Sequence, residues 1–267
     1  MSASDGPIGL FDSGVGGLTV ARALARKLPK ERLLYFGDTA HLPYGEKSPE
    51  AIRSYALGIS QHLVKQGAKA IVVACNSASA VALDMLKEEL KVPVFNVIDP
   101  VVEYLERHKA SHIGIWGTRA TVSSGIYPRK LAEVLPHSLV SPMATPLLVP
   151  VIEENLLSGE VTDAVVSLYL NDPRMANVEH LVLACTHYPL IASQISKQLE
   201  KKVAVLRIPA IVAQSITKQL DSLQLLRESP SELPHHFAVS DYTESFEKIS
   251  RIFFGKGISL HEENIWA

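Results

Sequence analysis

The sequence predicts an α/β protein built from two pseudo-symmetric parallel-sheet domains with a cleft between them. Short apolar runs alternate with segments of helical periodicity, which is typical of parallel α/β layers. The pattern then restarts near Val101, so the chain contains an internal repeat. Its apolar fraction is 47% and its aromatic fraction only 6%, which favours the aliphatic core of parallel sheets. We expect residues 1–98 and 208–267 to form one domain, and 99–207 the other.

The elements of the first repeat follow from apolar runs and their punctuation. Strands are expected at 8–11, 33–36, 70–74 and 92–97, and helices at 18–28, 49–66 and 77–90. Ser48 is the expected N-cap of the second helix, with Pro49 at its first position and Gly67 after its end. The segment 39–48, which contains a Pro-Tyr-Gly turn, is expected to be a loop.

The second repeat follows the same alternation. Strands are expected at 113–116, 139–141, 181–184 and 203–207. Helices are expected at 101–108, beyond Ser123, and at 151–157, 161–170, 188–200 and 209–226. A loop at 228–234, a strand at 237–239 and a helix at 243–254 complete the chain.

The only two cysteines occur in closely similar contexts, IVVACNS at 71–77 and LVLACTH at 181–187. Each apolar run ends in Ala-Cys and is followed by polar residues that suit a helix cap. A thiolate is the reactive form of cysteine, and a helix start lowers its pKa from about 8.5. A single buried cysteine is often only a small apolar group. Two in matched contexts favour a chemical role, in which one removes a proton from a carbon and the other supplies one to the opposite face.

Polar residues follow the expected strands at their carboxyl ends, where parallel α/β sheets bind ligands. These residues are Asp12, Ser13, Cys75, Asn76, Thr118, Cys185, Thr186 and His187. Facing ends of two such units make a cleft for one small ligand. The carboxylates of an amino acid would suit backbone donors together with Ser13, Asn76, Ser77, Thr118, Thr121 and Thr186.

Three further features leave alternatives open. His187 can relay a proton to Cys185 or contact the ligand, and Asp12 can assist Cys75 or simply make a turn. Tyr44-Gly45 is either a flap over the site or an ordinary turn. Residues 12–17 are glycine-rich, but they match neither the P-loop nor the G-x-G-x-x-G pattern, so nucleotide binding is poorly supported.

Composition excludes several classes of protein. The net charge is −2 and no dense Lys/Arg run occurs, so a nucleic-acid partner is not expected. No apolar stretch approaches the ~20 residues of a membrane span, and the N-terminus lacks the pattern of a signal peptide. Two cysteines do not make a disulfide scaffold. We therefore expect a cytoplasmic protein that does not bind membranes.

The sequence resembles the glutamate racemases of the aspartate/glutamate racemase superfamily. The matching motifs span nearly the whole chain and are residues 9–17 (GLFDSGVGG), 36–39 (FGDT), 43–45 (PYG), 74–76 (ACN) and 185–189 (CTHYP). In that family a cofactor-independent enzyme supplies D-glutamate for bacterial peptidoglycan. The resemblance implies two α/β domains with the active site between them, no cofactor, no metal, and commonly a homodimer.

The resemblance also implies residue roles. Cys75 would take the proton from D-glutamate and Cys185 from L-glutamate, assisted by Asp12 and His187, with Glu153 a further acidic group. Together with the hydroxyls above, the expected substrate-binding residues are Asp12, Ser13, Pro43, Tyr44, Gly45, Asn76, Ser77, Thr118, Thr121, Thr186 and His187. The chain departs from the family pattern at Ser77, usually Thr, and at Thr145, where many members carry cysteine.

Other functions remain as alternatives. An aspartate or hydantoin racemase would keep the chemistry and change the side-chain pocket. A thiol hydrolase or transferase with a Cys–His pair would leave one cysteine without a role. A metal-binding module using Cys75, Cys185 and His187 lacks a close Cys-x-x-Cys pair. An amino-acid-binding protein without catalysis would not need two thiols.

Overall fold

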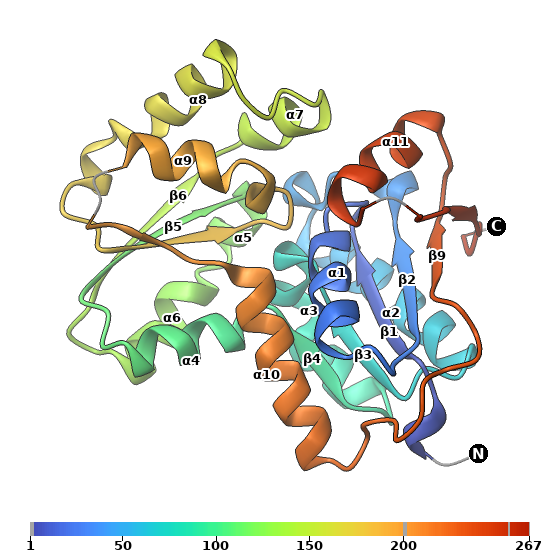
Figure 1. Ribbon diagram of the computed structural model, residues 1–267. Coiled ribbons are helices and arrows are strands. Elements are labelled where there is room, and N and C mark those ends of the chain that lie inside the picture. The colour runs from blue at the N-terminus through green and yellow to red at the C-terminus, as the bar shows by residue number, and fades with distance from the viewer. Residues whose placement is uncertain (1–2, 200–201, 256, 267) are drawn as a thin grey trace.

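The computed structural model describes residues 3–199, 202–255 and 257–266. These residues form two separate parallel β-sheets with helices on both faces of each sheet (Figure 1). The α/β class and the two parallel sheets expected from the sequence are confirmed.

The larger sheet contains six strands in the order β10-β9-β2-β1-β3-β4, and every neighbouring pair is parallel. Its strands are β1 (Ile8–Asp12), β2 (Leu33–Gly37), β3 (Ala70–Val73), β4 (Val94–Asn96), β9 (His236–Val239) and β10 (His261–Glu262). All five residues of β1 are buried, as are all five of β2, because helices cover both faces.

The smaller sheet contains four parallel strands in the order β6-β5-β7-β8. They are β5 (His112–Gly117), β6 (Leu139–Ala144), β7 (His180–Ala184) and β8 (Ala204–Val205). This order repeats the β2-β1-β3-β4 order of the larger sheet, so β5 corresponds to β1 and β7 to β3. The internal repeat is therefore confirmed at the level of topology.

Helices connect successive strands and pack on the sheets. They are α1 (Leu18–Lys27), α2 (Pro49–Lys65), α3 (Asn76–Glu89), α4 (Asp99–Arg107), α5 (Arg119–Ser123), α6 (Ile126–Val134), α7 (Leu148–Glu153), α8 (Glu160–Leu170), α9 (Ala192–Gln198), α10 (Ile208–Ser222) and α11 (Glu244–Phe253). Alternate residues of β1 serve opposite faces. Leu10 lies in the apolar cluster that contains α1 residues, and Phe11 in the cluster that contains α2 and α3 residues.

The chain leaves the first sheet and later returns to it. Strands of the larger sheet come from residues 8–96 and 236–262, and strands of the smaller sheet from 112–205. Helix α10 packs against both α1 and α4 on its way back (Figure 1). We therefore propose the domain limits 1–98 plus 208–267, and 99–207. Residues 1, 2 and 267 of the first domain, and 200 and 201 of the second, lie outside the described residues, as does 256.

The predictions for the two ends of helix α2 are confirmed. The Ala51 amide donates to Ser48 Oγ at 3.2 Å, and Pro49 is the first residue of α2. Gly67 has φ of +89°, the left-handed region that glycine adopts at a helix end.

Four element predictions are wrong at their boundaries. The helix expected at 188–200 is a 3₁₀ turn (Tyr188–Leu190) followed by α9 (Ala192–Gln198); residue 200 lies outside the described part. The helix expected at 151–157 is α7, which ends before Asn155 with φ of +58°. Helix α10 ends before Gln224, with φ of +56°, and does not reach residue 226. The strand expected at 203–207 shortens to Ala204–Val205.

Other elements were missed or underestimated. The short helix α5 and the terminal strand β10 were not expected, and β6 is longer than 139–141. The expected loop at 39–48 contains two 3₁₀ turns, Thr39–His41 and Tyr44–Glu46. Elements of two to five residues contain too few positions for a periodicity to show.

Candidate active site

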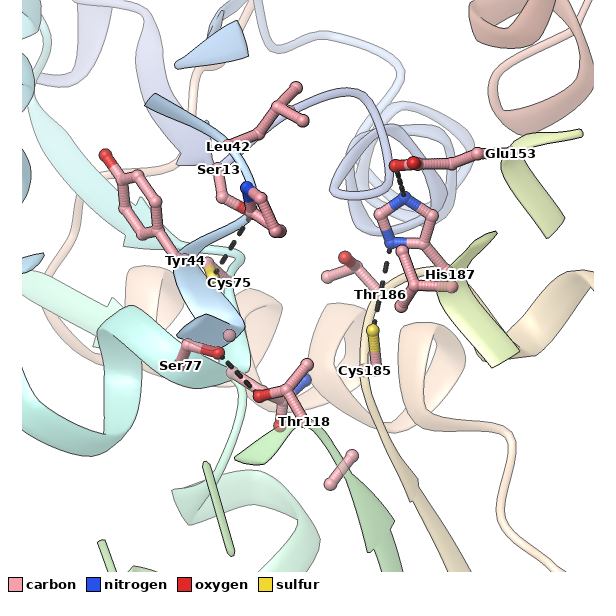
Figure 2. A pocket seen from close by; sticks show the side chains of 16 residues that line it. Ser13, Leu42, Tyr44, Cys75, Ser77, Thr118, Glu153, Cys185, Thr186 and His187 are labelled. Carbon is pink, nitrogen blue, oxygen red and sulfur yellow. Dashed lines mark hydrogen bonds and ion pairs between the residues drawn. The ribbon is translucent and has the colours of Figure 1, made fainter. Parts of the chain in front are cut away.

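A hollow lies between the carboxyl ends of the two sheets, and both units contribute to its walls. Its empty space, counted together with the solvent at its open mouth, is about 450 Å³. Its lining is Ser13, Gly14, Leu42, Pro43, Tyr44, Gly45, Cys75, Asn76, Ser77, Thr118, Val149, Glu153, Ala184, Cys185, Thr186 and His187. Figure 2 shows Cys75 and Cys185 on opposite sides of this hollow. The cleft expected between the two units is therefore present.

Most of the predicted site residues line the hollow, and two do not. Asp12 and Thr121 lie behind the wall, with 0% and 2% of their surface exposed. Both still contact residues of the wall, as the hydrogen bonds below show. The sequence therefore placed Asp12 and Thr121 close to the site, but it did not show that they lie behind the residues that line the hollow.

Cys75 follows β3 and is the N-cap residue of α3, as its sequence context indicated. Its thiol lies 3.8 Å from Ser13 Oγ (Figure 2). Burial and the negative charge of Asp12 raise the pKa of Cys75 to about 12, and these effects outweigh the hydrogen bonds from the Ala78 amide and from Ser13. The expected lowering of the pKa by the helix start is therefore overridden, and Cys75 is a protonated thiol at neutral pH.

Cys185 follows β7, the strand that corresponds to β3, but its surroundings differ. No α-helix begins at Cys185, because the next residues form turns and then the 3₁₀ turn at Tyr188–Leu190. The expectation that a helix start also activates this thiol is wrong. A neighbouring imidazole takes that place, since His187 Nδ1 lies 3.8 Å from Cys185 Sγ.

His187 joins Cys185 to an acid from another element (Figure 2). Its Nε2 lies 3.1 Å from Glu153 Oε1, at the end of α7. The ring of Phe253, from α11, packs against the imidazole edge-on at 5.3 Å. Burial disfavours the imidazolium, but the hydrogen bonds with Cys185 and Glu153 outweigh burial and raise the pKa of His187 to about 10.

Asp12 both shapes the turn after β1 and stands beside the site. Its Oδ2 accepts a hydrogen bond from the Gly17 amide at 2.9 Å, which is the turn-making role. Its Oδ1 accepts from Thr186 Oγ1 at 3.5 Å, across the boundary between the two units. The same carboxylate contributes to the raised pKa of Cys75. The two interpretations of Asp12 left open by the sequence are therefore compatible.

Three hydroxyl groups meet at the lower wall of the hollow. Ser77 Oγ lies 2.9 Å from Thr118 Oγ1 and 3.4 Å from Thr121 Oγ1, and the two threonine oxygens lie 3.1 Å apart. Thr121 thus positions the two hydroxyls that line the hollow. Beside them, Tyr127 donates to Asn76 Oδ1 at 2.9 Å and so leaves the amide nitrogen of Asn76 available for other acceptors.

Two glycines allow the units to approach closely. A Cβ on Gly16 would lie 2.5 Å from Thr186 Oγ1 and 2.6 Å from His187 Nδ1. A Cβ on Gly45 would lie 2.7 Å from Thr118 Cβ. Any side chain at either position would therefore displace atoms of the opposite wall.

Four lining residues were not predicted from the sequence, namely Gly14, Leu42, Val149 and Ala184. Leu42 precedes the Pro43 that had been noted, and Val149 lies one helical turn before Glu153 on α7. Apolar lining residues give no chemical signal in a sequence. Only their spacing from Pro43 and Glu153 could have indicated them.

The described residues contain neither a metal-binding cluster nor a membrane-spanning helix. In residues 3–199, 202–255 and 257–266, no three His, Cys, Asp or Glu side chains gather so that they could hold a metal ion. Within the same ranges, no helix combines the length and apolar character that crossing a membrane requires.

Comparisons with known proteins agree with this geometry. The profile of the Asp/Glu/Hydantoin racemase family matches residues 16–216. The chain is 43% identical to the glutamate racemase of Thermus thermophilus, over 96% of this chain and 97% of that protein. It superposes on the glutamate racemase of Francisella tularensis, solved in complex with D-glutamate, with a TM-score of 0.90 at 32% identity, covering 98% and 99% of the two chains. The aspartate racemase of Picrophilus torridus shares the fold alone, with a TM-score of 0.58 at 20% identity over 81% and 94% of the chains.

Proposed function

The chain belongs to the Asp/Glu/hydantoin racemase family, and from that premise we propose that it interconverts L-glutamate and D-glutamate by two-base proton transfer at Cα. The enzyme is an isomerase of the amino-acid racemase class. The observation that carries the mechanism is the pair Cys75 and Cys185, at equivalent strand ends on opposite sides of one hollow. Inversion of a stereocentre needs a base on one face and an acid on the other, and this pair supplies both.

In the L-to-D direction, the thiolate of Cys185 takes the Cα proton of L-glutamate. The electron pair of that C–H bond stays on the substrate and delocalises into its α-carboxylate. The thiol of Cys75 then donates its proton to the opposite face, which gives D-glutamate, a Cys185 thiol and a Cys75 thiolate. The D-to-L direction runs through the same steps in reverse.

Different groups surround the two thiols. The raised pKa of Cys75 keeps it as a thiol, ready to donate. The pKa of His187 is raised to about 10, so a positively charged imidazolium lies 3.8 Å from Cys185 Sγ at neutral pH. Glu153 holds that imidazolium from its other side. Asp12 is the acidic group beside Cys75 and would assist that thiol.

The polar walls suit the two carboxylates and the ammonium group of glutamate. We assign the carboxylates to the hydroxyls and amides of Ser13, Asn76, Ser77, Thr118 and Thr186, with Thr121 positioning Ser77 and Thr118. Donors fixed before the substrate arrives also stabilise the negative charge that develops on the α-carboxylate. We assign Pro43, Tyr44 and Gly45 to a flap over the substrate, because all three line the hollow and Gly45 lies against Thr118.

We further propose that the D-glutamate supplies peptidoglycan synthesis in the cytoplasm, that no cofactor takes part, and that the protein is a homodimer. All of these follow from the family resemblance, and the absence of a cofactor also follows from a site whose chemistry needs only thiols. Sedimentation equilibrium tests the homodimer, and a mass of one protomer at micromolar concentration would contradict it. Neither a nucleic acid nor a membrane is a proposed partner.

The decisive experiment is incubation with L- or D-glutamate in D₂O. We expect deuterium at Cα together with loss of optical rotation, without added pyridoxal phosphate or metal. If neither isomer exchanges its α-proton, the racemase proposal is wrong. If aspartate is turned over with a higher kcat/KM than glutamate, the chemistry stands and the substrate assignment fails.

The two-thiol mechanism has its own test. Cys75→Ser and Cys185→Ser should each abolish racemisation, because a serine hydroxyl is far too weak an acid to replace a thiol in either role. Circular dichroism spectra of both variants should match that of the unchanged protein. Full activity in either variant would refute the mechanism.

A further inference from the structure

Asp38 joins the flap over the active site to the C-terminal end of the chain. Its carboxylate is fully buried and accepts hydrogen bonds from Tyr44 Oη at 2.6 Å and from Trp266 Nε1 at 2.9 Å. Ser240 Oγ donates to the same carboxylate at 2.9 Å, and His41 Nδ1 lies 3.0 Å from it. Tyr44 lines the active-site hollow, whereas Trp266 lies 228 residues from Asp38 in the sequence.

The C-terminal segment is fixed along the edge of the larger sheet before it reaches Asp38. Strand β10 pairs with β9 at the outer edge (Figure 1), and the Glu263 amide donates to Val239 O at 2.9 Å. The Glu263 carboxylate lies 2.6 Å from His236 Nε2 and 3.0 Å from His62 Nε2. These contacts fix the position of the segment that leads to Trp266.

The indole ring of Trp266 packs against helix α2 at a position where a glycine leaves room for it. It lies over Gly58 of α2, where an added Cβ would approach the ring to 2.9 Å. The ring also contacts Tyr55 and His41 edge-on, with centroids 5.6 Å and 5.0 Å away. Among these neighbours His41 belongs to the segment that leads into the flap, and Tyr55 packs on Tyr44 at 5.7 Å.

The flap is therefore held from two sides. Gly45 abuts Thr118 of the second unit, and Tyr44 is bound from behind by Asp38. We propose that Trp266 is a positioning residue, which acts through Asp38 and Tyr44 to hold the flap at residues 42–45 closed over the substrate. This proposal rests on the racemase function proposed above. Trp266 itself does not line the hollow.

The expected consequence is a change in substrate binding more than in proton transfer. Without the indole N–H, the buried Asp38 carboxylate loses one of its donors and holds Tyr44 less firmly. Residues 42–45 line the hollow, whereas the two thiols follow β3 and β7, and the hydrogen bond of Trp266 goes to Asp38. KM should therefore rise while kcat changes little.

Two variants separate this positioning role from a structural one. Trp266→Phe keeps an aromatic ring over Gly58 and removes the N–H donor. Gly58→Ala leaves Asp38, Tyr44 and Trp266 unchanged but displaces the ring, while alanine favours the helix itself. Glu262→Gln is the matched control, because Glu262 is an exposed residue of the same segment.

We expect Trp266→Phe and Gly58→Ala each to raise KM for both enantiomers by about 5-fold or more, with kcat within about 2-fold and Tm unchanged or, for Gly58→Ala, raised. Glu262→Gln should behave as the unchanged protein. Wild-type KM in both Trp266→Phe and Gly58→Ala would overturn the proposal, as would a fall in Tm with no change in KM.

A measurement without substrate keeps this test independent of the proposed reaction. Amide hydrogen exchange in residues 39–47 should be faster in both variants than in the control, while exchange in β5 stays the same. Equal exchange in residues 39–47 overturns the positioning role even if the protein proves to be a racemase. A wild-type protein that does not racemise glutamate refutes the proposed function instead, and the exchange result then still decides whether Trp266 holds the flap.

Discussion

Cys75 and Cys185 occupy equivalent positions in the two repeats, yet different groups control them. Burial and Asp12 keep Cys75 protonated, whereas the His187 imidazolium stands beside Cys185. The two thiols therefore have equivalent places in the fold and different electrostatic surroundings.

This asymmetry cannot alter the ratio of kcat/KM between the two directions. Enantiomers have equal free energies in water, so the equilibrium constant of racemisation is one and the two kcat/KM values must be equal. The different surroundings of the thiols can change only how each direction divides between kcat and KM. Variants of Asp12 and His187 should therefore be compared by kcat and KM separately.

The raised pKa of Cys75 gives a prediction at the level of one residue. In a Cys185→Ser variant Cys75 is the only thiol, so its alkylation rate by iodoacetamide reports its thiolate alone. The rate should keep rising with pH toward the pKa of about 12. Adding Asp12→Asn should move the profile to lower pH, because the substitution removes a negative charge beside the thiol. A profile with the pKa of free cysteine in both variants would contradict the prediction.

The raised pKa of Cys75 also makes the stability of the folded protein depend on pH. The folded pKa of about 12 lies above the reference value of 9.0, so the folded state holds this proton more tightly than the unfolded state. The stabilisation is complete below pH 9.0 and is lost as the pH rises toward about 12. The difference in Tm between the unchanged protein and Cys75→Ser should follow this course.

At the level of elements, the turn after β1 controls how closely the two units approach. Gly16→Ala would place a Cβ 2.5 Å from Thr186 Oγ1 and 2.6 Å from His187 Nδ1, so one wall of the site must move. Displacing a catalytic group by about 1 Å can cost about 100-fold in rate, and we expect a loss of kcat/KM of that order. Gly14→Ala, in the same turn, has its nearest neighbour at 3.7 Å and should lose far less activity. Equal activities of the two variants would show that the close approach is unimportant.

Elements also show where sequence reasoning succeeds and fails. Helix α2 could be predicted at both ends, because Ser48, Pro49 and Gly67 act on the backbone within one turn. The helix after Cys185 could not, because Pro189 occupies a position that also suits the first turn of a helix. Local rules thus fixed the caps of α2 but left two outcomes open at Pro189, and packing selected the 3₁₀ turn.

At the level of the whole molecule, a buried ion pair supports the sheet at the edge opposite the active site. Lys69 Nζ lies 2.6 Å from Glu31 Oε2, and the two side chains are 3% and 2% exposed. Lys69 also donates to Ser4 O at 2.8 Å, and the Arg227 amide donates to Glu31 Oε1 at 2.9 Å. The pair therefore links the N-terminal segment to the chain that follows α10.

Removing one partner of this pair should destabilise the protein strongly. Glu31→Gln leaves the Lys69 charge buried without its counterion, and we expect the free energy of unfolding to fall by about 3–5 kcal/mol. Urea denaturation measures it, and KM of the folded protein should not change, because the pair lies at the amino ends of the strands. Glu50→Gln, which breaks a surface pair at 3.9 Å with Arg53, should cost less than about 1 kcal/mol. Comparable losses in the two variants would contradict the prediction.

The sequence by itself determined the α/β class, the internal repeat and the identity of the two thiols with most of their polar neighbours. These follow from local periodicity, and from the rule that the carboxyl ends of parallel strands share one edge. The tertiary structure decided that Asp12 lies beside Cys75, that Glu153 reaches His187, and that Trp266 reaches Asp38. Such contacts join segments that are far apart in the chain. They depend on how the two sheets and the C-terminal segment pack, which no local pattern encodes.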